Sequence, residues 1–385
     1  MSRRRICVVV TARPSYSRIK TALLAIHEHG DLELELVVAA SALIDRYGGV
    51  VRQIERDGLP VAHRVHMLVD GESPVAMAKT TGLGIIELST VFHHLAPDFV
   101  VTVADRYETL ATAVAASYQN LPLVHVQGGE VTGSIDEKVR HSITKLADAH
   151  LVASEGAAER VRRMGERPES IFVTGCPSID LAAAVRESPA LDFDVFERYG
   201  GVGAQLDLSG GYLVVLQHPV TTEHDLALEH VSATLEAVSR VGLPTLWFWP
   251  NPDAGSDGTS KGLRRYREQH RPAWLHFFRN MAPDDFLRLL LGAACLVGNS
   301  SVGIRECSFL GVPVVNIGSR QAGRERGGNV LDVPHSPGQI EAAIRDHLAR
   351  PRPSEDHLYG DGRAGSRIAD RLAVLTPTFE KRIAY

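Results

Sequence analysis

The sequence predicts an α/β protein with two doubly wound parallel sheets, one in each of two domains. Short β-branched runs alternate with longer amphipathic stretches along the whole chain, a pattern typical of parallel strands covered by helices on both faces. The chain has 385 residues, more than one hydrophobic core usually holds, which favours two domains of roughly 150–200 residues. The alternation of apolar runs and amphipathic stretches is interrupted over the Gly-, Asp- and Pro-rich stretch 187–211 and resumes after it. We therefore expect a first domain over residues 1–186 and a second domain from residue 187.

Short apolar runs predict the strands, and segments of helical spacing such as 17–29 and 107–119 predict the helices between them. The expected strands of the first domain are 6–10, 34–39, 99–103, 123–126, 150–153 and 171–173. Those of the second domain are 212–216, 245–249, 275–278, 295–297 and 314–317. The longest apolar run, 286–297, carries Arg288 and falls short of the roughly 18 residues that span a bilayer. We interpret it as a buried helix that runs into a strand.

Charge and cysteine content exclude several classes of protein. The chain has 41 basic and 46 acidic side chains, a net charge of −5, whereas a nucleic-acid surface needs a concentrated basic stripe. The N-terminus runs directly into an apolar strand, so we expect no secretion signal and no membrane partner. The four cysteines lack C-x-x-C spacing and are expected to be buried, reduced thiols of a cytoplasmic protein: Cys7, Cys176, Cys295 and Cys307.

Loops at the carboxyl ends of parallel strands are where ligands bind. The loop after the first strand carries Arg13, beside a helix N-terminus that could hold an anion, although a plain strand-to-helix turn explains this loop equally well. Asp105 directly follows the strand 99–103 and is either a helix cap or a catalytic group.

The run 127–137 combines three glycines with several acids. Glycine permits the backbone to approach a ligand closely, and we favour a functional role for the run. Ser134 or Asp136 could instead simply cap the helix that follows.

The second half has its own polar loops. His218 ends a strand just before Pro219 and is either a site residue or a turn histidine, whereas turn residues explain the loop 249–256. The hydroxyl-rich turn 298–303 leads into a helix and can hold phosphate through backbone N–H groups and serines. Glu306 has the acceptors to bind both ribose hydroxyls, and Arg320 and Arg324 can contact phosphate or base. The 17 histidines are scattered and no metal-binding motif emerges.

Taken in order, these stretches resemble the hydrolysing UDP-N-acetylglucosamine 2-epimerases, which include bacterial sialic-acid pathway enzymes and the epimerase half of the animal bifunctional epimerase/kinase. The resemblance covers nearly the whole chain. Its most specific stretches are DRY at 105–107, GGEVTGSID at 128–136, RHSITK at 140–145, GCPS at 175–178, LQHPVTT at 216–222, PDAGS at 252–256, GNSS at 298–301 and NIGSRQ at 316–321.

The resemblance implies two Rossmann-like domains that face a cleft, as in the GT-B glycosyltransferases. The second domain would then span 187–365, and the segment 366–385, with a helix near 365–376, would cross back to the first domain. The implied reaction eliminates UDP from UDP-GlcNAc across C1–C2 to give a 2-acetamidoglucal, to which water adds to give ManNAc. It requires neither a metal nor a nicotinamide cofactor, and the implied assembly is a homodimer or homotetramer.

The resemblance also assigns roles to residues. The implied catalytic residues are Asp105, Glu130, Asp136 and His218. The implied substrate- and UDP-binding residues are Arg13, Arg106, Gln127, His141, Asn251, Ser300, Ser301, Glu306 and Arg320. The chain departs from the animal members at Gln127, where they carry a glutamate, and at Ser15, where they carry an acid.

Two alternatives stay open beside the 2-epimerase. One is a hydrolase or epimerase on the same scaffold that acts on another UDP-sugar, such as a diacetamido-trideoxy sugar. The other is a non-catalytic nucleotide-sugar sensor.

Overall fold

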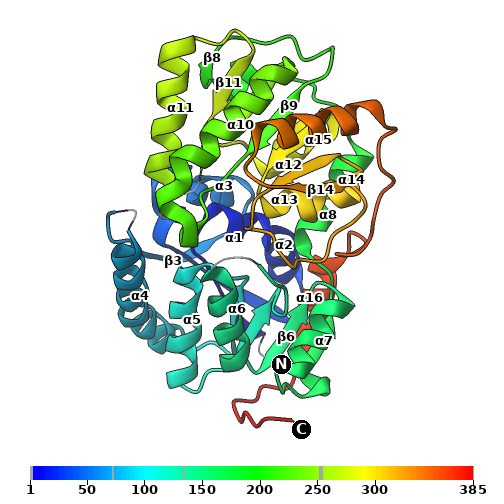
Figure 1. Ribbon diagram of the computed structural model, residues 1–385. Coiled ribbons are helices and arrows are strands. Elements are labelled where there is room, and N and C mark those ends of the chain that lie inside the picture. Colours follow the sequence, from blue (N-terminus) through cyan, green and yellow to red (C-terminus); the bar gives the residue numbers. More distant parts are fainter. Residues whose placement is uncertain (1–2, 72, 133–134, 251–254, 385) are drawn as a thin grey trace. The chain divides into compact units, whose positions relative to one another are not determined.

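The computed structural model describes residues 3–71, 73–132, 135–250 and 255–384. The chain divides into two compact units, each with its own sheet (Figure 1). Unit 1 consists of residues 1–130, 136–181 and 359–385, and unit 2 of residues 131–135 and 182–358. Each unit has a parallel sheet covered by helices, so the predicted fold class is confirmed. The division falls between Leu181 and Ala182, and the stretch 187–211 lies within unit 2.

Unit 1 contains a seven-stranded parallel sheet with the order β3-β2-β1-β4-β5-β6-β7. The strand order reverses between β1 and β4, and the loops that follow these two strands meet at that point. The strands are β1 (Arg4–Val10), β2 (Leu32–Ala39), β3 (Val61–Val65), β4 (Phe99–Val103), β5 (Leu123–Val126), β6 (Ala149–Val152) and β7 (Ile171–Val173).

The helices of unit 1 cover both faces of its sheet. Helices α2 and α16 pack on one face, against alternate residues of β1 such as Ile6 and Val8. Helices α4, α5 and α6 cover the other face, against Cys7 and Val9. The helices are α1 (Arg13–Ser17), α2 (Lys20–Glu28), α3 (Val50–Arg56), α4 (Pro74–Leu95), α5 (Tyr107–Tyr118), α6 (Ile135–Leu146), α7 (Glu155–Arg163), α8 (Pro177–Glu187), which runs into unit 2, and α16 (Ala364–Val374), with 3-10 turns η1 (Ala40–Leu43), η2 (Asp45–Tyr47) and η3 (Pro168–Ser170).

Unit 2 repeats this plan with the strand order β14-β13-β12-β9-β10-β11-β8, and its reversal lies between β12 and β9. The short strand β8 pairs antiparallel to β11. The strands are β8 (Val202–Gly203), β9 (Leu213–Leu216), β10 (Thr245–Phe248), β11 (Leu275–Phe278), β12 (Cys295–Gly298), β13 (Val314–Ile317) and β14 (Val330–Val333). Helix α10 packs between α11 and α15. The helices are α9 (Val195–Tyr199), η4 (Thr221–Leu226), α10 (Ala227–Val241), α11 (Ser256–His270), α12 (Pro283–Gly292), α13 (Ser301–Ile304), α14 (Glu306–Leu310) and α15 (Pro337–Ala349).

All eleven predicted strands are present, with ends that differ by at most two residues. The prediction missed β3, β8 and β14, and each of these is an edge strand of its sheet. Edge strands are half-exposed, and β3 accordingly includes the polar residues His63 and Arg64. Such strands lack the continuous apolar run that marks a central parallel strand. All four cysteines are buried and free, as predicted.

Helix α4 corrects one prediction, because it is a longer apolar segment than 286–297. It has 22 residues and is the one helix, among the described residues, that is long and apolar enough to pass a test for a membrane span. Its buried residues recur every four positions, at Ala76, Thr80, Gly84, Leu88 and Phe92. Such a stripe is typical of a helix that packs with one face on a protein core, and α4 packs along α5 (Figure 1).

The C-terminal helix α16 belongs to unit 1 and packs on α2. Gly365 lies against the backbone of Thr21, where a side chain would collide with it. The carboxylate of Asp180 accepts hydrogen bonds from the backbone N–H groups of Ala364 (2.8 Å) and Gly365 (2.6 Å) and from the Thr21 hydroxyl (2.9 Å). A small residue and a half-buried carboxylate therefore hold the start of this helix.

Candidate active site

Asp105 lies where the strand order of unit 1 reverses, two residues after the end of β4. It is buried, and the preceding residue, Ala104, has a φ of +63°. Left-handed backbone is rare for residues other than glycine and is found preferentially at functional sites. Arg106, not Asp105, is the N-cap residue of α5. Asp105 instead forms ion pairs with Arg18, at 3.1 Å, and with Arg140.

Arg140 on α6 joins Asp105 to the glycine-rich run. Its side chain is fully buried, and besides the ion pair with Asp105 its Nη1 donates to the backbone oxygen of Glu130 at 2.8 Å. Asp136 lies four residues earlier, on the same face of α6. One guanidinium group thus ties two of the candidate carboxylate residues together. Neither Arg18 nor Arg140 was among the predicted site residues.

Packing within unit 1 by itself requires glycine at two of the three glycine positions in the run. A side chain at Gly129 would collide with the backbone oxygen of Ala157, and one at Gly128 would contact the ring of His125. Gly133 and Ser134 lie outside the described residues.

Gln127 is buried and has a φ of +66°. Its amide Nε2 donates to the sulfur of Cys176 at 2.9 Å, and that sulfur lies 3.0 Å from the hydroxyl of Ser178. The carbonyl Oε1 of Gln127 has no hydrogen-bond partner among the described residues. The side chain therefore contacts the GCPS stretch.

His125 supports the same region from within the core. Its Nε2 lies 2.9 Å from the backbone oxygen of Ala104 and its Nδ1 lies 3.1 Å from the Thr144 hydroxyl. Burial lowers the pKa of His125 to about 3. The ring is therefore neutral, and both of its nitrogens have partners.

Arg13 and Arg106 are two arginines of the candidate site in unit 1 whose positive charges act on each other. Arg13 begins α1, and burial together with the charge of Arg106 lowers its pKa to about 10. Arg106 forms an ion pair with the buried Glu108 at 3.0 Å. His141, by contrast, is half-buried and its Nε2 lies 3.3 Å from Glu137 on the same helix. Two guanidinium groups that repel each other are a favourable setting for an anion.

In unit 2, Asn299 joins the loops after β9 and β12. Its side chain accepts a hydrogen bond from the backbone N–H of His218 at 2.7 Å and donates one to the backbone oxygen of His218 at 2.8 Å. Its own backbone oxygen accepts hydrogen bonds from Arg320 at 3.1 Å and Gln321 at 2.9 Å. His218, Asn299 and Arg320 thus converge where the strand order reverses. Asn299 was not singled out in the sequence.

The predicted phosphate-binding turn is present, but its helix is broken. Ser300 caps the four-residue helix α13 by accepting from the N–H of Val302 at 3.4 Å, and Ser301 accepts from Arg305 at 3.0 Å. A kink at Arg305 starts α14, whose first residue is the buried Glu306. The helix that follows the turn is therefore divided in two, and Glu306 is the first residue of the second part. Asn251 lies outside the described residues.

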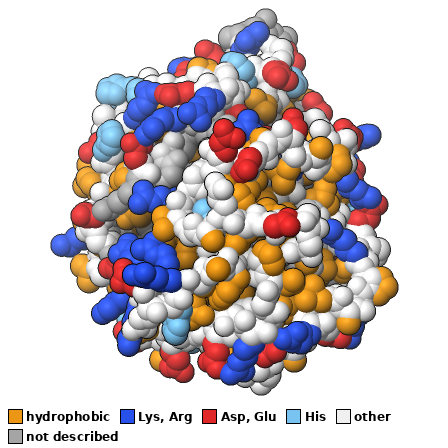
Figure 2. Space-filling view, turned by 90° about the horizontal axis from the view of Figure 1, so that it is seen from above, with side chains coloured by type: hydrophobic (Ala, Val, Ile, Leu, Met, Phe, Trp, Pro, Cys, Tyr) orange, Lys and Arg blue, Asp and Glu red, His pale blue; other side chains and the backbone are white. Residues whose placement is uncertain are grey.

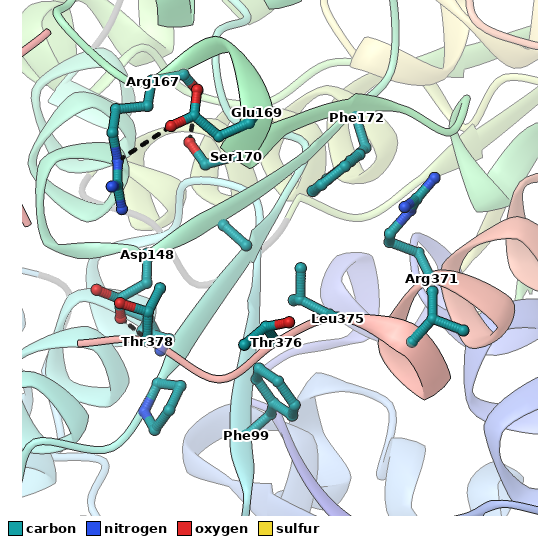
Figure 3. A pocket seen from close by; sticks show the side chains of 14 residues that line it. Phe99, Asp148, Arg167, Glu169, Ser170, Phe172, Arg371, Leu375, Thr376 and Thr378 are labelled. Carbon is teal, nitrogen blue, oxygen red and sulfur yellow. Dashed lines mark hydrogen bonds and ion pairs between the residues drawn. The ribbon is translucent and has the colours of Figure 1, made fainter. Parts of the chain in front are cut away.

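The pocket in Figure 3 lies at the amino-terminal ends of the unit 1 strands, whereas Asp105 follows the carboxyl end of β4. It has a volume of about 340 Å³ and is lined by residues at the amino ends of strands, such as Phe99 and Leu123, and by the chain after α16. The guanidinium of Arg371 lies 4.2 Å from the ring centre of Phe172 there. None of the predicted site residues lines it.

The surface bears on the expected partners. On the face seen in Figure 2, Lys and Arg side chains are intermixed with Asp and Glu side chains. A nucleic-acid surface would instead need a concentrated basic stripe.

Two doubly wound parallel sheets, each with converging polar loops where its strand order reverses, define the GT-B-like class of α/β proteins. The chain belongs to the UDP-N-acetylglucosamine 2-epimerase family, whose sequence model matches residues 24–373. A UDP-N,N'-diacetylbacillosamine 2-epimerase (hydrolyzing) of Legionella pneumophila is 32% identical over 97% of this chain and 96% of its own length. A UDP-N-acetylglucosamine 2-epimerase of Neisseria meningitidis is 31% identical over 93% and 91%.

Solved structures share the fold. The UDP-GlcNAc 2-epimerase of Methanocaldococcus jannaschii, in complex with UDP-GlcNAc and UDP, has a TM-score of 0.81 at 18% identity and covers 96% of this chain and 99% of its own. A Staphylococcus aureus MnaA structure with UDP has a TM-score of 0.78 at 18% identity, covering 99% and 100%.

Proposed function

We propose that this protein is a hydrolysing UDP-GlcNAc 2-epimerase. A base removes the proton at C2, the electrons of that bond form the C1–C2 double bond, and UDP leaves with the electrons of the C1–O bond. Water then adds its hydroxyl to C1 while a proton returns to C2 from the opposite face, which gives ManNAc. The observation that carries the proposal is the buried Asp105, ion-paired with Arg18 and Arg140 beside the Glu130 loop, in a chain of this family.

In the proposed enzyme, unit 1 supplies the acid/base groups and unit 2 supplies most of the contacts to the nucleotide. In unit 1, Asp105, Glu130 and Asp136 are the acid/base candidates. A weakly acidic C–H group requires a well-placed carboxylate and a stabilised leaving group. In unit 2, His218, Ser300, Ser301 and Arg320 contact the diphosphate or the sugar, and Glu306 binds the ribose hydroxyls. Arg13 adds to the phosphate contacts, and Arg106, Gln127, His141 and Asn251 complete the substrate-binding set.

Gln127 does not take the proton in this scheme, because a carboxamide accepts none at neutral pH. Its amide Nε2 donates to the sulfur of Cys176, within unit 1. The proton-accepting group must then be one of the three carboxylates named above. We propose that Gln127 shapes the loop that carries Glu130.

A second candidate substrate is a UDP-linked diacetamido-trideoxy sugar. The observation that favours it is the Legionella relative, named as a UDP-N,N'-diacetylbacillosamine 2-epimerase, which aligns over nearly the full length of both chains. This alternative keeps the same elimination and differs only in the substituents of the sugar. We further propose that the enzyme works in the cytoplasm as a homodimer or homotetramer and needs no cofactor for the elimination.

Product analysis by NMR tests the proposal. The enzyme is incubated in deuterated buffer with EDTA and with each of a panel of UDP-sugars. Release of UDP together with ManNAc that carries deuterium at C2 is the expected result. GlcNAc without deuterium at C2 would show simple hydrolysis instead. Tight binding of UDP-sugars without turnover would identify a sensor, and preferential turnover of a diacetamido sugar would select the second candidate.

A further inference from the structure

Three potential metal ligands that are far apart in sequence meet in unit 2. Glu223 lies in η4, His230 in α10, and His335 follows β14. Their ligand atoms all lie within 4.8 Å of one another, and His230 Nε2 is 3.9 Å from Glu223 Oε2. Donor atoms of a tetrahedral zinc ion sit roughly 3.4 Å apart, since each is about 2.0–2.1 Å from the metal. Small side-chain movements therefore bring this set to coordination distance.

The two histidine rings have donor atoms to offer. Both ring nitrogens of His335 are buried and have no hydrogen-bond partner within the described part of the chain. Burying a polar atom without a partner is unfavourable, and few native groups remain in that state without a reason. A neutral imidazole nitrogen without a hydrogen-bond partner is free to bind a metal ion.

A hydrogen bond from Ser319 orients the carboxylate of Glu223. The Ser319 hydroxyl donates to Glu223 Oε1 at 2.6 Å, which leaves Oε2 as the oxygen nearest to His230. Metal-binding carboxylates usually have such an outer hydrogen bond. On the other side, Gly318 has a φ of +76°, and a side chain at this position would collide with His335. The glycine keeps open the space that the His335 ring occupies.

We propose that Glu223, His230 and His335 bind one divalent transition-metal ion of the zinc type. Two imidazole nitrogens and one carboxylate oxygen form one of the ligand sets that bind zinc in proteins, with a fourth position for water. The rings of His230 and His335 lie parallel with their centres 3.5 Å apart. For both rings to bind the same ion, one of them has to turn about its Cβ–Cγ bond. This rotation costs little energy, because the torsion has a broad minimum.

The proposed ion would lie close to the loops that carry His218 and Arg320, two candidate substrate-binding residues. Glu223 follows His218 by five residues, and its partner Ser319 precedes Arg320. A metal bound to Glu223 and His335 would join η4 to the loop after β14. The hydrogen bond from Ser319 to Glu223 would link the loop after β13 to the same site. The ion has no part in the elimination itself, so this inference stands independently of the proposed function.

Metal binding to the full-length protein, without any sugar nucleotide, tests the inference. Protein treated with EDTA and then freed of it is titrated with Zn²⁺ by calorimetry and with Co²⁺ by visible absorption. We expect one ion per chain and the intense visible bands of a low-coordinate Co²⁺ complex. Glu223→Gln and His335→Gln should each weaken Zn²⁺ binding by more than the ~10-fold typical of losing an outer partner. The matched control is His357→Gln, which alters a histidine 3.5 Å from the exposed Glu355 in the same unit and should bind as the wild type does.

Two results would overturn the inference. One is a wild type that binds no equivalent of Zn²⁺ above the level of an unrelated surface site. The other is Zn²⁺ affinity that survives both substitutions. Glu223→Gln keeps the shape of the side chain and the Ser319 hydrogen bond, so it decides the matter if His335→Gln fails to fold. Zinc K-edge spectra of the wild type with two imidazole ligands would support the site, and spectra without imidazole would exclude it.

Discussion

Arg140 is the residue on which the candidate site of unit 1 depends most. A single buried guanidinium holds the carboxylate of Asp105 and the backbone of Glu130. Lysine carries the same charge but presents it at one point, and it cannot reproduce the planar fork of arginine. The orientation of Asp105 should therefore be more sensitive to this position than to net charge.

Asp105→Asn and Arg140→Lys should both strongly reduce turnover of UDP-GlcNAc while UDP affinity stays close to that of the wild type. Arg140→Lys loses a charge-assisted hydrogen bond of about 1.5–3 kcal/mol, which corresponds to roughly 10- to 100-fold in kcat. Coupled detection of UDP gives kcat, and calorimetry gives UDP affinity. Arg162→Lys, on the exposed part of α7, is the control. Full activity in either site variant would make that residue a structural one.

Glu306→Ala should weaken UDP binding by about 1–3 kcal/mol, because a charged acceptor for two hydroxyls is lost. Calorimetry with UDP measures the effect, and Glu236→Ala, at an exposed position of α10, serves as the matched control. Wild-type affinity in Glu306→Ala would remove Glu306 from the ribose-binding role.

Gln127→Glu should change the pH profile or the preference among UDP-sugars without abolishing activity. The substitution removes the amide donor to Cys176 and places a carboxylate in a buried position, so we also expect a stability loss of about 1–3 kcal/mol. Glu130→Gln should instead abolish most turnover. A wild type inert with every UDP-sugar, combined with strong activity in Gln127→Glu, would show that the native chain is not the epimerase.

At the scale of elements, the order of the strands places the site loops. The reversal between β1 and β4 brings together the loops that carry Arg13 and Asp105, and the reversal between β9 and β12 does the same for His218 and Ser300. Helix α6 follows the glycine-rich run in the chain and places Arg140 beside Asp105.

Asp180→Ala should loosen α16 from unit 1. The carboxylate satisfies two N–H groups in the first turn of this helix and also binds Thr21, and losing such a cap costs about 1–2 kcal/mol. We expect a lower melting temperature and faster hydrogen exchange over 364–374. Asp361→Ala changes an exposed ion pair with Arg367 and should have little effect. Equal exchange rates in the two variants would contradict the capping role.

At the scale of the whole molecule, stability should fall as the solution becomes acidic. Burial lowers the pKa of His125 from 6.5 to about 3. Below pH 6.5 the unfolded chain therefore takes up a proton that the folded chain does not. Burial disfavours the ionised form of Glu166, but hydrogen bonds from His150, Lys145 and Lys381 outweigh it and lower its pKa from 4.5 to about 2. This second contribution is present above pH 4.5 and is lost as the pH falls toward 2.

Calorimetric melting between pH 7 and pH 4 measures this dependence. His125→Gln should flatten the curve below pH 6.5, by up to about 1.4 kcal/mol per pH unit, whereas His66→Gln, at an exposed position, should follow the wild type. Parallel curves for all three proteins would show that His125 does not stay neutral in the folded state.

The sequence alone determined the fold class, the central strands, the buried reduced cysteines and the loops where polar residues gather. These features are local, because a run of apolar residues or a turn is read from neighbouring positions. The family motifs pointed to Asp105, Glu130, His218 and Glu306 in the same way.

Only the tertiary structure decided which residues contact one another. The edge strands β3, β8 and β14 lack an apolar run, and their pairing appears only in the sheet. Arg140, on α6, and Asn299, directly after β12, matter because the fold brings them beside Asp105 and His218. Packing accounts for Gly128 and Gly129, and three separate elements assemble the Glu223–His230–His335 cluster. The physical reason is that side-chain contacts depend on strand order and helix placement, which join positions far apart in the chain and leave no periodic trace in the sequence.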